Sequence, residues 1–159
     1  MKVYRYIVVL ALLSLFIIPA KAQFNTDRIT AIGRNALYFE DYILSIQYFN
    51  QVIRLKPYLA EPYFYRAIAK IQLEDYQGAL RDCNAAIERN PFSPGCYYAR
   101  GYIYRQLNQW EDAEKDYTEA LHFSPENRTY MLLRADTRAQ MKQYDAALED
   151  IEHMLRREP

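Results

Sequence analysis

The chain has 159 residues, of which 51% are hydrophobic and 25% are charged, and its formal net charge at pH 7 is zero. This composition is that of an ordinary folded protein, and it excludes a disordered or collagen-like chain. Only 4 glycines are present, and they are scattered among stretches rich in Ala, Leu, Tyr, Arg and Glu, which favours helices over a turn-dense β architecture.

The first 22 residues have the features of a secretory signal peptide. Lys2 and Arg5 precede an apolar run at residues 7–18, and an A-x-A cleavage pattern follows at residues 20–22. The run is shorter than the roughly 20 residues that a membrane-spanning helix needs. We therefore expect an exported protein, periplasmic or secreted, with a bacterial envelope favoured. The alternative is an uncleaved segment that tethers the domain at residues 23–159 to the outer face of a membrane.

Removal of this segment changes the charge balance of the chain. It subtracts Lys2, Arg5 and Lys21 but no acidic residue, which leaves 17 basic against 20 acidic side chains and a net charge of −3. A chain with this balance lacks the basic surface that nucleic-acid binding requires. An oxidising compartment permits Cys83 and Cys96 to pair, and the alternative is two small buried thiols.

The rest of the chain repeats with a period of 34 residues, which is typical of stacked helix hairpins. Prolines at this spacing divide it into repeats at residues 26–59, 60–93, 94–127 and 128–159. The eighth position is small and the seventeenth is aromatic: Gly33, Ala67, Gly101 and Ala135; Tyr42, Tyr76, Trp110 and Tyr144. Each repeat is predicted to form two antiparallel helices, at about positions 2–14 and 18–30. The loops at residues 90–94 and 124–127 are expected to stop one helix and cap the next.

These repeats resemble the tetratricopeptide repeat, a helix-turn-helix family, over residues 26–159. The resemblance implies an all-α fold, a right-handed superhelical solenoid of four tandem repeats with a concave groove lined by the first helices. Two positions depart from the family pattern. The bulky fourth position is occupied by Ile29, Tyr63, Tyr97 and Met131, and the seventh holds Arg in three copies where the family has Leu.

The resemblance also implies which residues line the groove. They stand at the second, fifth, sixth, ninth, twelfth and thirteenth positions, and most are aromatic or apolar. The candidates for binding a partner are Arg34, Leu37, Tyr38, Phe64, Tyr65, Ile68, Ile71, Tyr98, Tyr102, Arg105, Leu132 and Asp136. Because Tyr and Arg are enriched among interface anchors, we expect the groove to accept an apolar extended or helical segment of a partner polypeptide. The alternative is that these aromatics pack against an N-terminal extension or a further domain.

One subset of the family clamps a C-terminal carboxylate with Lys at the fifth and Asn at the ninth position of its first repeat. This chain has Thr30 and Arg34 there. The next Asn of that pattern is Tyr65, and the later basic pair is Gly95 and Ala99. A cytosolic chaperone co-factor is therefore disfavoured.

Two further positions change together along the chain. Three repeats have Arg at the seventh and Asp at the twenty-third position, whereas the first repeat has Ile32 and Tyr48. This covariation predicts structural ion pairs within each repeat: Arg66 with Asp82, Arg100 with Asp116, and Arg134 with Asp150. The alternative register pairs each Asp with the Arg of the following repeat.

The sequence offers no catalytic, cofactor or metal motif. His122 and His153 lie near helix ends, and the chain lacks H-E-x-x-H, C-x-x-C, a glycine-rich phosphate loop and G-x-S-x-G. The acidic residues Glu111, Asp112 and Glu114 are interpreted as solvated charges at a helix N-terminus. We expect a non-catalytic scaffold that needs no cofactor and binds a protein or peptide.

The end of the fourth repeat suggests an alternative function. Met154 and Leu155 occupy positions that cover the next hairpin in earlier repeats, so an unburied apolar strip is expected there. The alternative is therefore an N-terminal fragment or module of a larger exported protein, in which the repeats mediate self-assembly or intramolecular docking. Self-association through this C-terminal hairpin is one form of it.

Overall fold

The computed structural model describes residues 26–156, which are helical except for short turns and contain no β-strand. A helix at residues 26–38 comes first. It is followed by α2 (Tyr42–Leu55), α3 (Glu61–Gln72), α4 (Tyr76–Arg89), α5 (Pro94–Gln106), α6 (Trp110–Phe123), α7 (Arg128–Gln140) and α8 (Tyr144–Leu155). Within residues 26–156, no helix combines the length and apolar character of a membrane span. The expected signal peptide lies outside the described residues.

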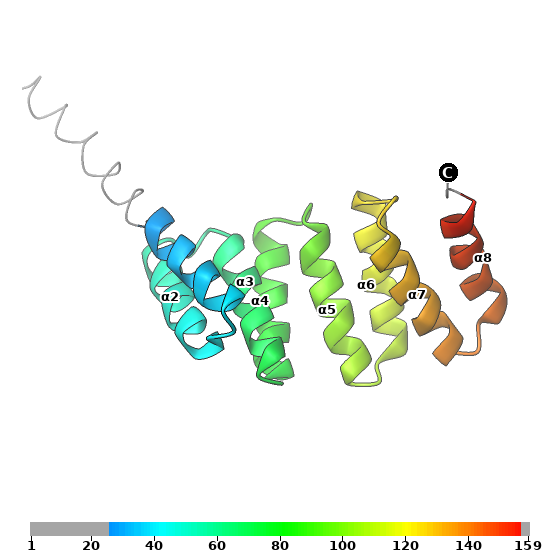
Figure 1. Ribbon diagram of the computed structural model, residues 1–159, viewed down its shortest axis with the longest axis horizontal. Coiled ribbons are helices and arrows are strands. Elements are labelled where there is room, and N and C mark those ends of the chain that lie inside the picture. Colours follow the sequence, from blue (N-terminus) through cyan, green and yellow to red (C-terminus); the bar gives the residue numbers. More distant parts are fainter. Residues whose placement is uncertain (1–25, 157–159) are drawn as a thin grey trace, which may run out of the picture.

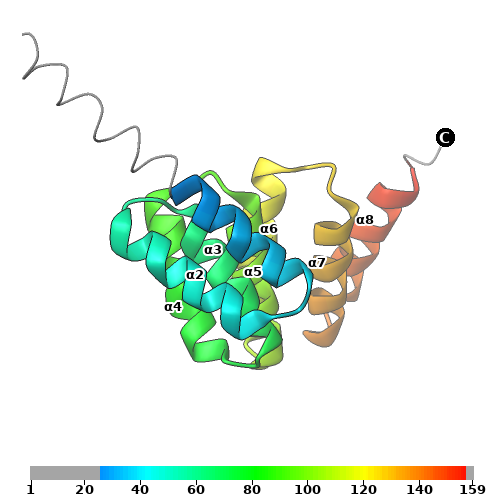
Figure 2. The ribbon, with the colours of Figure 1, turned by 60° about the vertical axis from the view of Figure 1, so that its left-hand side comes forward.

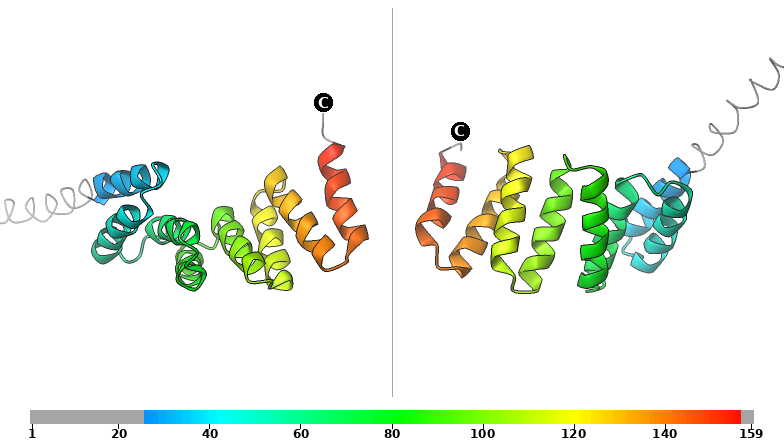
Figure 3. Two further views of the ribbon diagram at one scale, coloured as in Figure 1. Left: turned by 60° about the horizontal axis from the view of Figure 1, so that its bottom comes forward. Right: turned by 180° about the vertical axis from the view of Figure 1, so that it is seen from behind.

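The helices form one row of antiparallel hairpins. Each helix from α2 onward packs on its neighbours in the chain, and α3 also contacts α5, the first helix of the next hairpin. The row is seen side-on in Figure 1 and from below and behind in Figure 3. Its hairpins turn relative to one another along the row (Figure 2). The predicted all-α superhelical solenoid is therefore confirmed.

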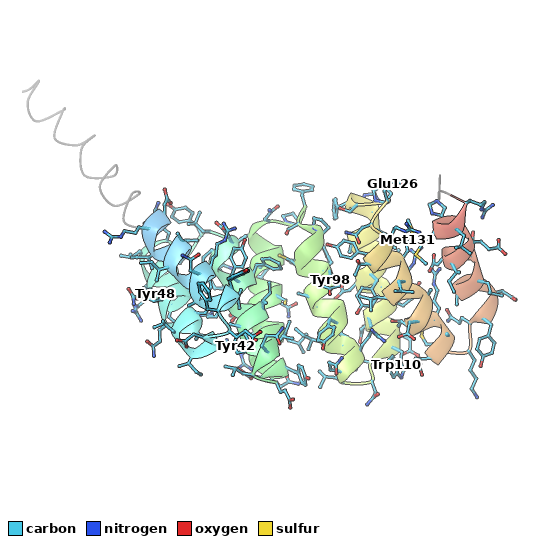
Figure 4. All side chains as sticks on the ribbon, in the orientation of Figure 1. Tyr42, Tyr48, Tyr98, Trp110, Glu126 and Met131 are labelled. Carbon is cyan, nitrogen blue, oxygen red and sulfur yellow. The ribbon has the colours of Figure 1, made fainter. Side chains whose placement is uncertain are left out.

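A left-handed residue closes the turn of each hairpin. The fifteenth positions of the four repeats have positive φ angles: Glu40 (62°), Glu74 (59°), Asn108 (57°) and Lys142 (62°). The next residue then bonds back into the first helix, as Asp75 N does to Lys70 O at 2.9 Å. This geometry ends the first helix and satisfies one of its last carbonyls. The aromatic residues at position 17 follow directly, and Figure 4 shows Tyr42 and Trp110 on the same side of the row.

The expected capping residues are only partly right. Asn127 Oδ1 accepts a hydrogen bond from Tyr130 N at 3.1 Å and caps α7. In the loop at residues 90–94, however, Ser93 makes no capping bond to the backbone of α5, and its Oγ lies 3.4 Å from Cys96 Sγ. Pro94 begins α5 instead, because its fixed φ suits the first helical position and its missing N–H needs no cap.

The small residues at position 8 compensate for the residue that faces them on the second helix. A Cβ on Gly101 would lie 3.0 Å from Cε1 of Tyr117, and one on Gly33 would lie 3.1 Å from the ring of Phe49. Ala67 occurs where the core residue of the second helix is small, since it packs in one buried cluster with Cys83. In these three hairpins a small residue at position 8 therefore lets the first helix approach the second closely, and it is glycine where the facing residue is a large aromatic.

Three bidentate ion pairs join the two helices of the last three hairpins. Arg66 donates to Asp82 at 2.8 and 2.5 Å, Arg100 to Asp116 at 2.8 and 2.7 Å, and Arg134 to Asp150 at 3.1 and 2.5 Å. Each Arg thus pairs with the Asp of its own repeat, and no Asp pairs with the Arg of the following repeat among the described residues. The remaining nitrogen of each Arg bonds position 25 of the preceding hairpin: Asn50 (2.5 Å), Asn84 (2.7 Å) and Thr118 (3.3 Å). Each Arg therefore holds two hairpins together.

A second cation reaches two of these carboxylates. Lys70 lies 2.7 Å from Asp82 and Arg138 lies 3.0 Å from Asp150. Arg138 also bonds Glu114 of the preceding hairpin at 2.7 Å, so the interpretation of Glu114 as a solvated charge was wrong. Glu114 is drawn inward because Arg138, one hairpin further on, lies half-buried beside it. Its neighbours Glu111 and Asp112 are exposed.

Candidate functional site: a groove between first helices

A hollow of about 310 Å³ lies between α3 and α5, the first helices of two successive hairpins. Its wall consists of Phe64, Ile68, Ile71, Gln72, Tyr98, Ala99 and Tyr102. Five of these are predicted groove residues. Those on α3 stand at positions 5, 9 and 12 of the second repeat, and those on α5 at positions 5 and 9 of the third. That spacing places them on one stripe of each helix. None of these wall residues carries a charge.

The floor of the hollow is anchored in the core. Phe64 and Ile71 pack against a buried cluster that contains Ala67, Cys83 and Ile103. A Cβ on Gly95 would lie 3.2 Å from the Phe64 ring, so this glycine lets the first turn of α5 come close to the ring. The wall is therefore held in place before any ligand binds, which lowers the entropic cost of binding.

Aromatic residues extend the site toward α7. Tyr98 stacks on Tyr130, with ring centroids 5.1 Å apart, and its ring lies 6.4 Å from that of Tyr117. Burial raises the pKa of Tyr130 and of Tyr117, so both stay neutral at physiological pH. Figure 4 shows Tyr98 in the middle of the row. Tyr130 stands at position 3, which is not a groove position of the family pattern, and sequence reasoning missed it.

The N-terminal side of the site is built around Tyr65. Its ring stacks on Phe49 at 5.6 Å and lies 5.3 Å from Phe64, and the guanidinium of Arg34 lies 5.2 Å from its centroid. Arg34 also lies 3.8 Å from Glu61, in an exposed pair that contributes little stability. The predicted groove residues Arg34 and Tyr65 therefore flank the hollow without lining it.

The other predicted groove residues are placed apart from the hollow. Tyr38 is 81% exposed and contacts Phe39 edge to face, while Leu37 is half-buried. Leu132 on α7 is 56% exposed. Arg105 and Asp136 form an ion pair between α5 and α7, so their charges neutralise each other beside the groove.

The two cysteines of residues 26–156 are not joined by a disulfide. Cys83 and Cys96 are both free and buried, and burial raises the pKa of both thiols. Within the described chain, no group of three or more His, Cys, Asp or Glu residues could hold a metal ion.

The comparisons with known proteins agree with this geometry. Residues 94–127 match the tetratricopeptide repeat family model. By sequence, the third hairpin is therefore a tetratricopeptide repeat. No curated protein matches the chain in sequence.

Several solved structures share the fold of the described residues. The crystal structure of MamA is 17% identical with a TM-score of 0.79, and the match covers 83% of this chain and 77% of that one. The Arabidopsis OM64 TPR domain is 23% identical with a TM-score of 0.71, covering 72% and 95%. The first TPR domain of Spaghetti (RPAP3), bound to the HSP90 peptide SRMEEVD, is 23% identical with a TM-score of 0.72, covering 74% and 93%. At these identities the likeness shows the fold, and tetratricopeptide repeats are in general interaction scaffolds.

Proposed function

We propose that this protein is a non-catalytic scaffold that holds an apolar segment of a partner polypeptide in the groove between α3 and α5. The observation that carries the proposal is the uncharged hollow walled by Phe64, Ile68 and Tyr102 and their neighbours. The solved RPAP3 domain, whose fold is similar, is bound to a peptide, which supports a peptide as the ligand class.

The chemistry of the wall decides which segment is bound. Ile68, Ile71 and the rings of Tyr98 and Tyr102 offer apolar area and two hydroxyl groups. Burial of one Leu or Phe side chain of the partner in such a hollow contributes about 1.5–3 kcal/mol. An acidic peptide would gain no counter-charge from these wall residues, so the favoured ligand is an aliphatic or aromatic side chain flanked by backbone that bonds the hydroxyls.

A peptide-display selection tests this proposal. Ile68→Ala with Tyr102→Ala removes wall area while keeping Phe64 and Tyr98, which also pack against the core and Tyr130. Peptides selected on the wild-type protein are expected to share apolar anchors and to bind this variant at least about tenfold more weakly, which corresponds to about 1.4 kcal/mol.

The matched control for that experiment truncates aromatics away from the groove. Tyr58 is 67% exposed and Phe92 is 73% exposed, and both stand in loops between hairpins. Tyr58→Ala with Phe92→Ala is expected to leave binding of the selected peptides unchanged. Equal affinity for the groove variant and the control would contradict the groove as the binding site.

We further propose that the protein works outside the cytoplasm, in a bacterial envelope or as a secreted protein. The support is the charged start, short apolar run and A-x-A pattern of residues 1–22. N-terminal sequencing of the protein isolated from its host is expected to begin at Gln23. A cytosolic protein that still begins at Met1 would contradict export.

A second candidate function is self-assembly through α8. Four apolar side chains form a stripe along this helix and are 36–59% exposed: Tyr144, Leu148, Ile151 and Leu155. The residues at the same positions of α4 include the half-buried Tyr76 and Leu80 and the buried Cys83, which pack with Ala99, Ile103 and Leu107 of the next hairpin. Light scattering on the wild-type protein and on Leu148→Glu tests it. An oligomer that dissociates in the variant is expected, and a wild-type monomer would contradict it.

A further inference from the structure

The fourth position of the repeat forms a recurring tyrosine site. The hydroxyl of Tyr63 donates to the carbonyl of Pro57 at 3.2 Å, and that of Tyr97 donates to the carbonyl of Pro91 at 3.0 Å. In each case the Arg at position 7 lies beside the ring, with its guanidinium carbon 5.5 and 5.7 Å from the centroid. Position 30 of the same hairpin also contacts each ring: the guanidinium carbon of Arg89 lies 4.3 Å from the Tyr63 centroid, and Phe123 stacks on Tyr97 at 5.9 Å. Each phenol ring thus lies beside the position-7 arginine and reaches the proline loop of the hairpin before it.

The last hairpin keeps the proline and the position-7 arginine of this arrangement but has no tyrosine at position 4. Its fourth residue is Met131, while Pro125 and Arg134 keep the positions of the proline and the arginine. A hollow of about 330 Å³ opens here between α6, α7 and α8. It is lined by Leu121, Pro125, Met131, Arg134, Arg138, Glu149, Asp150 and His153, and Asp150 is paired with both arginines. An adjoining hollow of about 170 Å³ shares Met131 and His153. Figure 4 shows Met131 and Glu126, which borders the smaller hollow, at the same end of this hairpin.

We propose that this hollow binds a tyrosine side chain of a partner polypeptide. The ring would lie against the guanidinium of Arg134, and the hydroxyl would donate to the carbonyl of Pro125, as in the two preceding hairpins. This site is on different helices from the groove between α3 and α5, so it does not depend on the function proposed for that groove.

Arg134 has the same bonding arrangement as the two arginines that contact tyrosine. It donates to Asp150 at 3.1 and 2.5 Å and to Thr118 at 3.3 Å, all through nitrogens at the edge of its guanidinium. Arg66 and Arg100 make the corresponding bonds and still contact a ring. The cation–π contact therefore needs no rearrangement of the ion pair.

Two apolar side chains of the hollow can contact a phenol ring. Leu121 and the thioether of Met131 supply an apolar wall, and sulfur makes favourable contacts with ring edges. Met131 has no hydroxyl that could donate to the carbonyl of Pro125 as Tyr63 and Tyr97 donate to Pro57 and Pro91. The volume stands at the lower end of the roughly 300–1,000 Å³ of small-molecule sites, which fits one side chain better than a larger ligand.

Nuclear magnetic resonance on the full chain tests the proposal with N-acetyl-tyrosinamide as the probe. The Arg134 Nε–H resonance is expected to shift saturably with this probe, to shift several-fold less at the same concentration of N-acetyl-phenylalaninamide, and not to shift with N-acetyl-leucinamide. In Met131→Tyr the new side chain fills the hollow, so the probe is expected to cause no shift. No saturable shift in the wild type, or an equal shift in Met131→Tyr, would overturn the proposal.

The stability of the same variant gives a second readout. If the hollow has the shape of the tyrosine site, Met131→Tyr is expected to raise the Tm by about 3 °C. The control Met141→Tyr changes a methionine that does not line either hollow and is expected to give no increase. A folded Met131→Tyr with a lower Tm would show that a tyrosine does not fit, and would overturn the inference.

Discussion

The buried carboxylate of Asp116 is neutralised by a single arginine, whereas Asp82 and Asp150 each have a second cation. It is 3% exposed, and within the described residues its ion pair is with Arg100 alone. Asp82 has Lys70 as a second cation, at 2.7 Å. At the position of Lys70, the third hairpin has Tyr104. The same substitution at two equivalent arginines should therefore have unequal effects.

We predict that Arg100→Met destabilises the protein by about 3–5 kcal/mol, because it leaves the carboxylate of Asp116 buried and unpaired. Arg66→Met is expected to cost only about 2 kcal/mol, the loss of hydrogen bonds to a charged group, because Lys70 still neutralises Asp82. Methionine preserves the apolar stem of arginine in both variants. Urea denaturation followed by far-ultraviolet circular dichroism measures the two free energies of unfolding.

The pH dependence separates this explanation from a loss of packing. Burial raises the pKa of Asp116 in the folded protein, although Arg100 opposes the shift. Because the folded carboxyl binds its proton more tightly than the unfolded one, its contribution to stability is complete below the unfolded pKa and is lost as pH rises through the folded pKa. Loss of Arg100 raises that pKa further. The cost of Arg100→Met relative to wild type should therefore be largest at pH 7 and smaller near pH 4.

Equal costs for Arg100→Met and Arg66→Met, with a difference from wild type that does not change with pH, would refute this reasoning. That result would mean that the arginine stems, and not their charges, hold the hairpins together.

Three smaller predictions concern the hairpin turns, the helix contact and the thiols. Glu74→Gly should raise the free energy of unfolding by about 0.5–1 kcal/mol, since relief of a left-handed strain of about 1–2 kcal/mol exceeds the entropic cost of glycine; an unchanged urea midpoint would contradict it. Gly101→Ala should lower the free energy of unfolding by about 1 kcal/mol, because its Cβ would lie 3.0 Å from Tyr117. In a Tyr117→Ile background the same substitution should raise the free energy of unfolding, since alanine favours the helix. A change of the same sign in both backgrounds would contradict this prediction. Neither Cys83 nor Cys96 should react with a thiol reagent at pH 8 until urea unfolds the chain, because burial raises the pKa of both; rapid reaction of the folded protein would show that a thiol is accessible.

The fold could be predicted from the sequence because it depends on features that recur. Prolines 34 residues apart, small residues at position 8 and aromatics at position 17 each repeat in all four copies. The covariation of position 7 with position 23 pointed to contacts such as Arg66 with Asp82, which the structure contains. Repetition within one chain thus supplied information that a single hairpin would not have given.

Contacts made once could not be predicted in this way. Arg105 pairs with Asp136 and Arg138 with Glu114 across successive hairpins, at sequence separations of 31 and 24 residues, and no other repeat has the same residues there. Tyr130 extends the aromatic groove from an unexpected position because it stacks on Tyr98. These contacts depend on how two hairpins turn relative to each other, which the 34-residue pattern does not specify.

Site-specific photo-crosslinking in the native host is the most direct test of the groove. A photoreactive amino acid replaces Ile68 in the wall of the hollow in one variant and the exposed Glu119 on α6 in the other. We predict a polypeptide adduct at position 68 that a display-selected apolar peptide competes away, and none at position 119. Adducts at position 119 alone, or adducts at position 68 that the peptide does not reduce, would contradict the claim that this groove binds the partner.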